Sequence, residues 1–169
     1  HCHRTQFVGT LRHQGRMHPD VATFPAGAFY AEECLSAVPL PHQQAASLGY
    51  EQPVEDPTDQ VLKKQRVVFF DVDDEHGNDE TDSDATLSDK VNVAEARLVA
   101  DLLRRIRRFY GEHFLAEKTV GVIVPYRNQI AEIRNRIDEY RIEALRDITI
   151  DTVERFQGSQ RDIIIYGFT

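Results

Sequence analysis

The sequence has few cysteines, no long apolar run and no excess of positive charge, and each absence excludes a class of protein. The two cysteines, Cys2 and Cys34, are too few and too far apart to form a disulfide framework, so we expect both thiols to be reduced. No window approaches ~18 consecutive apolar residues, which excludes a membrane-spanning helix. The first residues match neither a signal peptide nor a transit peptide, and we therefore expect an intracellular protein.

The net charge of −8 argues against a protein that coats nucleic acid, because such proteins carry an excess of basic residues. Nine acidic residues fall between Asp71 and Asp89, so the remainder of the chain is close to neutral and has room for a local basic strip. We expect residues 71–90 to form an exposed acidic loop, since closely spaced like charges repel. An EF-hand is excluded there, because the sixth position counted from Asp71 is His76 rather than glycine and the twelfth is Asp82 rather than glutamate.

One short cluster of side chains raises the question of a metal ion. His1, Cys2 and His3 are adjacent and belong to the residue types that bind zinc. The other histidines are scattered along the chain. We therefore predict no metal ligands in this sequence.

With 169 residues, 41% of them hydrophobic and 28% charged, the chain is long enough for one globular domain with a buried core. Three short apolar runs, at 119–124, 148–150 and 163–165, favour buried strands of a parallel sheet. Pro125 ends the first run, and apolar residues then repeat along one face of a helix expected over 127–140. Strand, helix, strand, turn and strand in this order are typical of an α/β domain whose parallel sheet is wound right-handedly.

A second helix is expected to begin at Asn92, because Asn92 and Glu95 have the spacing of a capping box. Apolar residues recur along it at intervals of three and four and end near Gly111; they are Leu98, Leu102, Ile106 and Phe109. The other side of this helix carries Arg104, Arg105, Arg107 and Arg108. Such a run is more often a solvated face than a nucleic-acid contact, and we expect a solvated face.

The first half of the chain is expected to hold one short helix and one strand. Proline at the first position predicts a helix that begins at Pro19, and Phe24-Pro25 is expected to end it. Five apolar residues in this region are expected to form a core patch; they are Met17, Val21, Phe24, Phe29 and Tyr30. Four prolines interrupt residues 36–65, which we interpret as a long connection, and the apolar run at 66–70 predicts a strand.

Polar side chains follow the strand expected at 148–150. Gln157 and Gly158 lie at the centre of the turn that leads to the next strand, where a glycine allows a positive φ or a close approach of the backbone to a ligand. The same turn carries Asp151, Thr152, Arg155 and Gln160. Because open α/β sheets bind ligands at the carboxyl ends of their strands, we interpret this turn as a site.

Arg16 is a separate candidate for binding a charged ligand. It lies on the turn just before the first helix, and its planar guanidinium with five donors is suited to gripping two phosphate oxygens at once. By itself the residue would be a weak indication, since most arginines only solvate a surface.

Three stretches of the chain together resemble superfamily 1 helicases of the Upf-like group, which includes DNA and RNA helicases. They read QGRMHP at 14–19, with FP at 24–25 and FY at 29–30 behind it, GVIVPYRNQ at 121–129, and DTVERFQGSQRD at 151–162. Their order and rough separations also fit this group. The resemblance implies an α/β, RecA-like fold of the P-loop NTPase type, a three-layer domain with a central parallel sheet, and makes residues 1–169 the second RecA-like domain of a motor.

In such helicases two RecA-like domains clamp ATP between them and move along a nucleic-acid strand. The resemblance implies that Arg16 is catalytic, as an arginine finger that reaches the γ-phosphate and stabilises the charge developing in hydrolysis. The residues implied in ATP binding are Gln14, Gln157, Gly158 and Gln160. Those implied in binding the nucleic-acid backbone are Pro125, Tyr126 and Thr152. The implied partners are single-stranded DNA or RNA and the first RecA-like domain of the same parent chain.

This sequence departs from the family pattern at three points. Gly15 stands where the family often has an aromatic residue that lies against the base, and Gln160 stands where it usually has glutamate. No G-x-x-x-x-G-K-[ST] loop is present, so ATP and Mg²⁺ are expected to be bound mainly by the first RecA-like domain. The chain also ends at Thr169, before the family's last arginine motif. We therefore expect a fragment that is inactive alone and works as an ATP-dependent helicase within its parent.

Two other functions stay open from the sequence. An apolar strand that ends in Asp71-Val72-Asp73 is typical of haloacid-dehalogenase-like, Mg²⁺-dependent phosphatases, in which the first aspartate attacks phosphorus and the second serves as the acid. Nothing after Val120 supplies the later pair of metal-binding aspartates convincingly. A non-catalytic interaction domain is also compatible with the sequence. Binding of ATP and single strands once the first motor domain is restored would distinguish it from a helicase.

Overall fold

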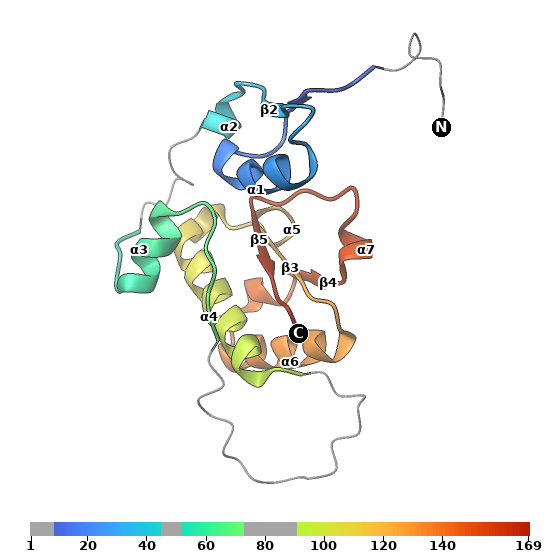
Figure 1. Cartoon of the computed structure of the whole chain (residues 1–169). Coiled ribbons are helices and arrows are strands. Elements are labelled where there is room, and N and C mark those ends of the chain that lie inside the picture. Colours follow the sequence, from blue (N-terminus) through green and yellow to red (C-terminus); the bar gives the residue numbers. More distant parts are fainter. Residues whose placement is uncertain (1–8, 45–51, 73–90) are drawn as a thin grey trace. The chain divides into compact units, whose positions relative to one another are not determined.

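The computed structural model describes residues 9–44, 52–72 and 91–169. The chain divides into two compact units, whose helices and strands are labelled in Figure 1. The N-terminal unit comprises residues 1–50 and 54–69, and the C-terminal unit comprises residues 51–53 and 70–169. Two sequence features, the His1-Cys2-His3 cluster and most of the acidic segment, lie outside the described residues.

Three parallel strands form the sheet of the C-terminal unit; they are β3 (Val120–Ile123), β4 (Thr149–Asp151) and β5 (Ile163–Tyr166). β3 lies in the centre, with β4 along one edge and β5 along the other. The register places Ile123 opposite Asp151 and Val120 opposite Ile163. The three strands and their parallel pairing, expected from the apolar runs, are confirmed.

Helices cover both faces of this sheet; they are α4 (Val93–Tyr110) and α6 (Arg127–Glu139) on one face and α7 (Val153–Phe156) on the other. Val120 and Val122 are fully buried in the same apolar cluster as Ile133 of α6. On the opposite face, the ring of Phe156 lies against Gly121. The unit is therefore an α/β domain of three layers with a central parallel sheet, as expected.

Local capping explains where α4 begins and ends. The side chain of Asn92 accepts a hydrogen bond from the backbone N–H of Glu95 at 2.9 Å, as the capping-box spacing predicts. The Glu95 carboxylate does not return to Asn92 but accepts from Gln129 and from the backbone of Phe168, so only half of the box forms. Gly111 ends the helix with a φ of +51°, a conformation that favours glycine.

The apolar stripe of α4 is confirmed, because Leu102, Ile106 and Phe109 are buried and Leu98 is half-buried. Short elements then connect α4 to β3 and α6 to β4; they are η2 (Gly111–His113), α5 (Ala116–Thr119) and η3 (Glu143–Leu145). None of the helices in the described parts of the chain is long and apolar enough to cross a membrane.

The four arginines of α4 do not form the solvated face that was expected. Arg104 and Arg105 both bind the carboxylate of Asp101, at N–O distances of 2.7 and 2.5 Å. Arg107 and Arg108 donate to backbone carbonyl oxygens of the same unit. All four are half-buried, because carboxylate and carbonyl oxygens within reach hold these side chains along the surface.

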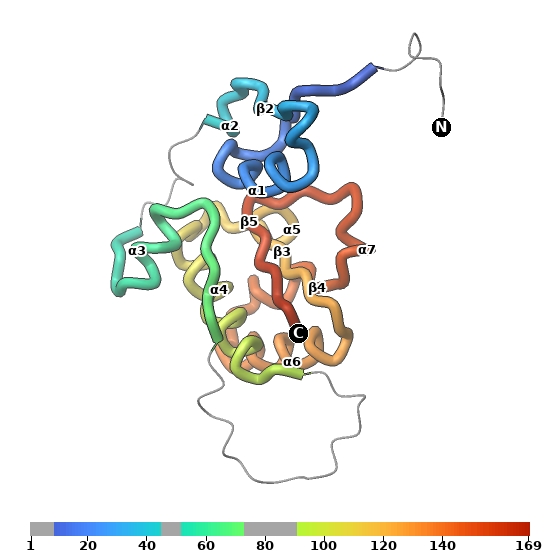
Figure 2. Tube along the Cα trace, viewed as in Figure 1, coloured from blue at the N-terminus to red at the C-terminus, as the bar shows by residue number. Residues whose placement is uncertain are grey.

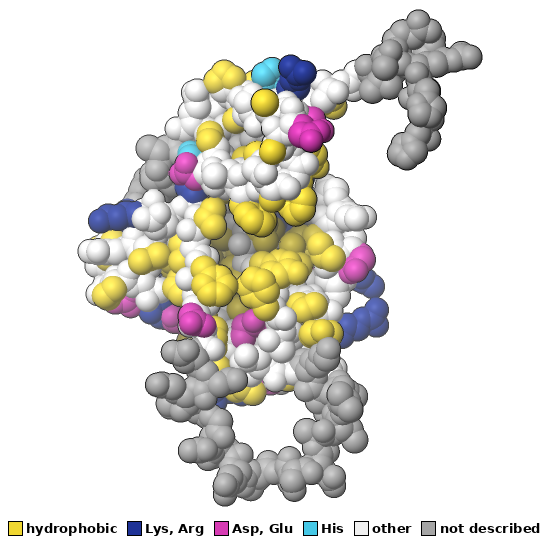
Figure 3. Space-filling view, in the orientation of Figure 1, with side chains coloured by type: hydrophobic (Ala, Val, Ile, Leu, Met, Phe, Trp, Pro, Cys, Tyr) yellow, Lys and Arg dark blue, Asp and Glu magenta, His cyan; other side chains and the backbone are white. Residues whose placement is uncertain are grey.

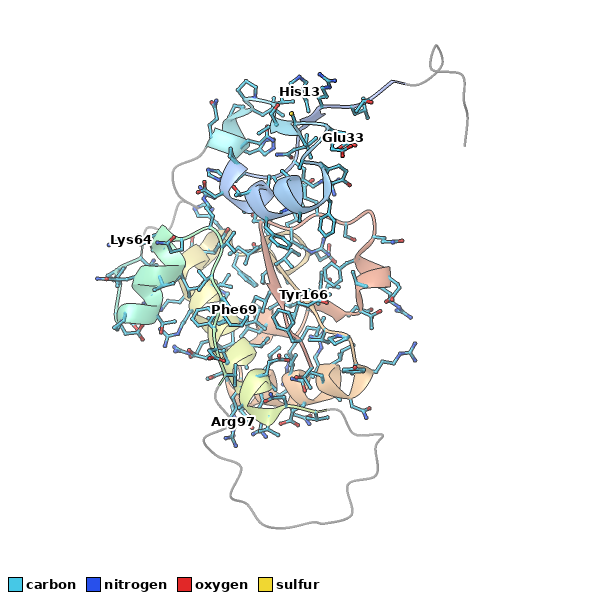
Figure 4. The ribbon with its side chains drawn as sticks, viewed as in Figure 1. His13, Glu33, Lys64, Phe69, Arg97 and Tyr166 are labelled. Atoms are coloured by element: carbon cyan, nitrogen blue, oxygen red, sulfur yellow. The ribbon has the colours of Figure 1, made fainter. Side chains whose placement is uncertain are left out.

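The strand β5 is less buried than its apolar sequence predicts. Ile163 and Ile165 pack against the core, whereas Ile164 and Tyr166 are 48% and 53% exposed. The aromatic ring of Phe168 follows at 69% exposure and meets the Tyr166 ring edge-on. Figure 3 shows hydrophobic side chains on the surface of this unit, and Figure 4 labels Tyr166 on the strand. The physical reason is that β5 is an edge strand, and Phe156 of α7 covers the central strand instead.

The N-terminal unit is built from short elements; they are β1 (His13–Gln14), α1 (Pro19–Phe29), β2 (Ser36–Ala37), α2 (Pro41–Gln44) and α3 (Pro57–Lys64). β1 and β2 pair in parallel. The ring of His13, labelled in Figure 4, hydrogen-bonds through Nδ1 to the hydroxyl of Ser36 on the partner strand at 2.9 Å.

The start of α1 is as predicted, but its end is not. The ring of His18 accepts a hydrogen bond from the N–H of Asp20 at 3.2 Å and caps the helix, and Pro19 is its first residue. The helix continues through Pro25 to Phe29. Pro25 has no N–H to donate to the carbonyl oxygen of Val21. Because Val21 is exposed, a water molecule can donate to that carbonyl instead.

The expected core patch around α1 is also wrong. Phe24 and Phe29 are 74% and 71% exposed, and their rings meet edge-on with centroids 6.2 Å apart. Val21 and Tyr30 are exposed too, and Met17 is half-buried. Since the helix is not broken at proline, small residues three to four positions apart form its inward face instead; they are Ala22, Pro25 and Ala26.

Residues 36–65 contain more regular structure than the long connection that was expected. β2, α2 and α3 all lie within this range, and Pro41 and Pro57 are first residues of helices rather than interruptions. The strand expected at 66–70 is wrong, because this described segment is not paired into a sheet. Val67 and Phe69 are 62% and 74% exposed. An apolar run becomes a strand only when a neighbouring strand satisfies its backbone groups.

Candidate functional site

The loop between β1 and α1 presents Arg16, and the side chain of Gln14 shapes that loop. The Oε1 atom of Gln14 accepts hydrogen bonds from the backbone N–H groups of Arg16 at 2.9 Å and Met17 at 2.7 Å. Its Nε2 atom donates to the carbonyl oxygen of Met17 at 2.7 Å. Both ends of the Gln14 amide are therefore occupied by the loop backbone.

The guanidinium group of Arg16 is exposed. Within the described residues it makes no hydrogen bond or ion pair. The backbone around it, in contrast, is held by several side chains of the same unit. A charged, five-donor group on a well-bonded loop is available to bind an anionic ligand such as a phosphate.

The carboxyl edge of the sheet, by which we mean the end where β3 and β4 finish, brings together Pro125, Tyr126 and Thr152. β3 and β4 pair as far as Ile123 and Asp151, and the N–H of Val124, the residue after β3, donates to the Asp151 carbonyl at 3.2 Å. Pro125 and Tyr126 therefore follow one strand where Thr152 follows its neighbour. All three lie at the carboxyl ends of adjacent parallel strands, the place where such sheets bind ligands.

The electrostatics at this edge are set by two carboxylates close to Thr152. Asp151 accepts from the backbone N–H of Thr152 at 2.8 Å and lies 3.6 Å from the guanidinium of Arg155. The hydroxyl of Thr152 hydrogen-bonds to Glu154 and, with the backbone of Glu154, lowers the pKa of that carboxyl. Negative charge at this edge is thus partly neutralised by Arg155.

The loop that carries Gln157, Gly158 and Gln160 does not stay at this edge. From α7 it runs back along the sheet to the start of β5, as the chain trace in Figure 2 shows. The next residue, Arg161, donates to the hydroxyl of Thr149 at the start of β4 at 3.2 Å. The sequence placed all the polar groups of this turn at the carboxyl ends of the strands, but Gln160 lies toward the amino ends.

Gly158 has a positive φ of +81°, which is one of the two possibilities that the sequence left open for it. The turn around it is closed by a hydrogen bond from the N–H of Ser159 to the carbonyl of Phe156 at 2.9 Å. Gln157, Gly158 and Gln160 are all exposed. The predicted ATP-binding residues of this loop are therefore open to a ligand.

Gly121, in the middle of β3, has a part in this site that the sequence did not reveal. A Cβ atom at Gly121 would lie 2.6 Å from a ring carbon of Phe156 and 3.2 Å from Cγ of Arg161. The guanidinium of Arg161 lies over the Phe156 ring, and it also donates to the Gln160 carbonyl at 2.8 Å. The absent side chain of Gly121 thus lets the loop lie directly on the strand. A glycine within an apolar strand, at the start of the GVIVPYRNQ stretch, was the sequence feature that could have indicated this close contact.

A second set of residues missed from the sequence lies behind Pro125 and Tyr126. Gln129 is fully buried, donates to the Glu95 carboxylate at 3.0 Å and exchanges two hydrogen bonds with the backbone of Asn92. Glu95 also accepts from the N–H of Phe168 at 2.9 Å. This network ties the start of α6, and with it the loop after β3, to α4 and to the end of β5.

The described residues do not by themselves fit a Mg²⁺ ion. No group of three or more His, Cys, Asp or Glu side chains among them is arranged to hold a metal. Of the two aspartates that a phosphatase would need, Asp73 lies outside the described residues, and Asp71 does not follow a strand. The phosphatase alternative therefore loses the strand on which it was based.

Comparison with known proteins places this site in a family. A family model described as "AAA domain" matches residues 1–169. The DNA polymerase alpha-associated DNA helicase A of Saccharomyces cerevisiae is 28% identical over 165 residues, which are 96% of this chain and 23% of that protein. The Regulator of nonsense transcripts 1 homolog of Arabidopsis thaliana is 28% identical over 92% of this chain and 11% of that protein.

An archaeal relative shows the same match. An uncharacterized ATP-dependent helicase of Methanocaldococcus jannaschii is 23% identical over 96% of this chain and 22% of that protein. The chain thus spans less than a quarter of each of these relatives. Because the family model covers the whole chain and the sheet has the parallel α/β arrangement, the chain belongs to the AAA domain family, with a RecA-like fold, and within it to the superfamily 1 helicases of the Upf-like group.

Proposed function

We propose that this chain is the second RecA-like motor domain of an ATP-dependent nucleic-acid helicase or translocase. Its part in the motor is to supply an arginine finger and one side of the clefts that bind ATP and a single strand. The relatives named as helicases support this proposal. Since the chain spans less than a quarter of those relatives, the activity belongs to a longer parent enzyme.

The observation that carries the proposal is the environment of Arg16. Its backbone is bonded on both sides, while its guanidinium is exposed and has no partner among the described residues. An arginine that stabilises charge on a departing γ-phosphate must be pre-positioned and must not spend its donors on an internal ion pair. The backbone of Arg16 is held in place, and its guanidinium is not committed to an internal ion pair among the described residues.

The other predicted residues take roles consistent with this proposal. Gln157, Gly158 and Gln160 line the nucleotide side of the cleft from an exposed loop, and Gln160 offers an uncharged partner for a ribose hydroxyl. Gln14 contributes to the ATP site through the loop that it shapes. Mg²⁺ neutralises phosphate charge when bound, and the first RecA-like domain supplies its ligands.

Single-stranded DNA or RNA is the proposed track. Pro125, Tyr126 and Thr152 hold its backbone at the carboxyl ends of β3 and β4. Tyr126 is 37% exposed and offers a ring as well as a hydroxyl at that edge. The first RecA-like domain of the same parent chain closes the cleft from the other side.

The test is the ATPase rate of the parent enzyme with Arg16→Ala and Arg16→Lys, measured with saturating nucleic acid. If Arg16 contacts ATP chiefly as the γ-phosphate departs, its loss lowers kcat by about 10³ to 10⁵ and leaves nucleotide affinity almost unchanged. Lysine restores little of the rate, because a point charge does not reproduce the planar fork.

Arg12→Ala is the matched control, because Arg12 is an exposed arginine of the same unit just before β1. We expect its kcat and melting temperature to stay close to those of the unchanged enzyme. A fall of less than about tenfold in a stably folded Arg16→Ala enzyme would remove Arg16 from the mechanism. A collapse of its melting temperature would instead assign the arginine a structural role.

A further inference from the structure

We propose that Gln43 of α2 is a positioning residue for Arg16, with His42 beside it. The two side chains hold the loop of residues 14–17 from outside by its carbonyl oxygens and so set the point from which the guanidinium of Arg16 extends. This inference deepens the proposed function of Arg16 and rests on it for its catalytic consequence. The structural part stands on the contacts of the N-terminal unit alone.

Gln43 is the buried residue of a helix that is otherwise on the surface. Its exposed fraction is 0%, whereas Pro41, His42 and Gln44 are exposed. A buried amide costs free energy unless its donors are bonded. Its Nε2 atom donates to the carbonyl oxygens of Gln14 at 2.9 Å and Met17 at 3.1 Å.

These two carbonyls lie on either side of Arg16. His42 adds a third tie, since its Nε2 lies 3.0 Å from the carbonyl oxygen of Gly15 and must donate to it. Three backbone carbonyl oxygens around Arg16, those of Gln14, Gly15 and Met17, are thus hydrogen-bonded to side chains of α2.

The inner side of the loop is held by Gln14, whose side-chain amide takes the N–H groups of Arg16 and Met17. The loop needs these ties because it has little packing of its own. Gly15 has no side chain, and a Cβ there would meet only Leu40, at 3.8 Å. Removing the outer ties therefore frees the backbone of Arg16 even though the guanidinium itself keeps its charge.

Pre-organisation is what a charge-stabilising group contributes to catalysis, and a displacement of about 1 Å at such a group costs on the order of 10² in rate. Arg16 is exposed, so no neighbour corrects its position if the loop moves. The residues that fix the loop therefore belong to the catalytic machinery without touching ATP. Gln43 makes the largest contribution, because it is buried and bonded on both sides of Arg16.

The first test needs no activity. In Gln43→Glu a carboxylate oxygen of nearly the same size replaces the N–H donor that faces two carbonyl oxygens. Hydrogen exchange of the backbone amides of Arg16 and Met17 is measured in this variant, in Gln44→Ala and in the unchanged chain. Gln44 is the exposed neighbour on the same helix. We expect exchange at both amides to become at least about tenfold faster in Gln43→Glu and to stay unchanged in Gln44→Ala.

His42→Ala keeps the test decisive if Gln43→Glu unfolds the N-terminal unit. This change removes one exposed contact, and we expect a smaller acceleration at the same two amides. Exchange at Arg16 that is unchanged in both variants would overturn the inference. Exchange in the C-terminal unit, for example at Val122, serves as the internal reference because that residue is fully buried in a different core.

The second test is a double-mutant cycle in the parent enzyme. We expect Gln43→Glu to lower kcat at least about tenfold with little change in nucleotide affinity, and to add nothing further when Arg16 is already alanine. Losses that multiply in the double variant would overturn the link between Gln43 and Arg16. If Arg16→Ala alone has no effect, the proposed function fails, and hydrogen exchange still decides whether Gln43 holds the loop.

Discussion

Arg16 and Arg104 show how the neighbours of an arginine decide whether its guanidinium is available to a ligand. Arg104 donates two hydrogen bonds to Asp101, and this carboxylate raises the pKa of the guanidinium above its usual value. Its donors are thereby committed to the surface of α4. Arg16 has no such partner among the described residues, so a phosphate can bind it without first breaking an ion pair. The free guanidinium, rather than arginine as such, makes Arg16 the candidate finger.

At the residue scale, Gly158→Ala is expected to destabilise the chain through its backbone alone. Gly158 has a φ of +81°, and a Cβ there would meet no atom within 4 Å. The cost is therefore conformational, roughly 1–2 kcal/mol of unfolding free energy. Urea unfolding of the chain measures it.

Gly27→Ala is the matched control, because Gly27 lies inside α1 and also has open space around a Cβ. In a helix interior the same change is expected to stabilise by about 1 kcal/mol. If both variants changed the unfolding free energy by the same amount, the positive φ would cost an alanine at position 158 nothing, and the prediction would be wrong.

At the scale of elements, the contact between β3 and α7 depends on the missing side chain of Gly121. In Gly121→Ala the new methyl group would meet the Phe156 ring at 2.6 Å, so the ring and the loop behind it must move. We expect a loss of about 1–3 kcal/mol of unfolding free energy, as is usual for overpacking. Chemical denaturation of the chain measures this loss.

Two further variants test whether the ring is the cause. Gly121→Ala combined with Phe156→Leu removes the clash. We expect this double variant to lose less unfolding free energy than the sum of the losses in the two single variants. Gly15→Ala places a methyl group at an ordinary contact distance of 3.8 Å from Leu40 and is expected to change stability little. Additive losses in the double variant would contradict the proposed contact.

The hydrogen-bond network of Asn92, Glu95 and Gln129 holds a second group of elements together. It joins the starts of α4 and α6 and holds the backbone that follows β5. The donors and acceptors named here lie inside the C-terminal unit, and through Gln129 they hold the start of α6, which follows the loop after β3. The proposed nucleic-acid site on that loop would benefit, because a loop that is already held loses less conformational freedom on binding.

At the scale of the whole molecule, the chain by itself is expected to fold but not to hydrolyse ATP. Its described residues hold an arginine and polar loop groups but no cluster that could bind Mg²⁺, and the sequence has no phosphate-binding lysine loop. Positioning and charge stabilisation make up most of phosphoryl-transfer catalysis, and both need the second wall of the cleft. Phosphate release in the presence of excess single-stranded nucleic acid measures this. ATP hydrolysis that stays with the chain through several chromatographic steps, and does not separate with contaminating proteins, would show that the chain holds a complete ATPase site. That result would contradict the proposal that the first RecA-like domain is needed.

The sequence by itself determined the C-terminal unit to a large extent. The strands at 120–123, 149–151 and 163–166 follow from apolar runs ended by proline or polar residues, and α4 follows from the cap at Asn92 and the glycine at 111. These signals are local, because an apolar run or a cap involves residues only a few positions apart. A positive φ at Gly158 was one of the two possibilities that the local sequence indicated, for the same reason.

Only the tertiary structure decided which side chains meet across the chain. Gln43 reaches a carbonyl 29 residues earlier, and Glu95 accepts from an N–H 73 residues later, so no local pattern marks either of them. The strand expected at 66–70 did not form, because pairing requires a partner strand that a single segment does not contain. The turn after β4 crosses to the other end of the sheet because the Phe156 ring packs against Gly121, which has no side chain. These two residues are 35 positions apart in the sequence.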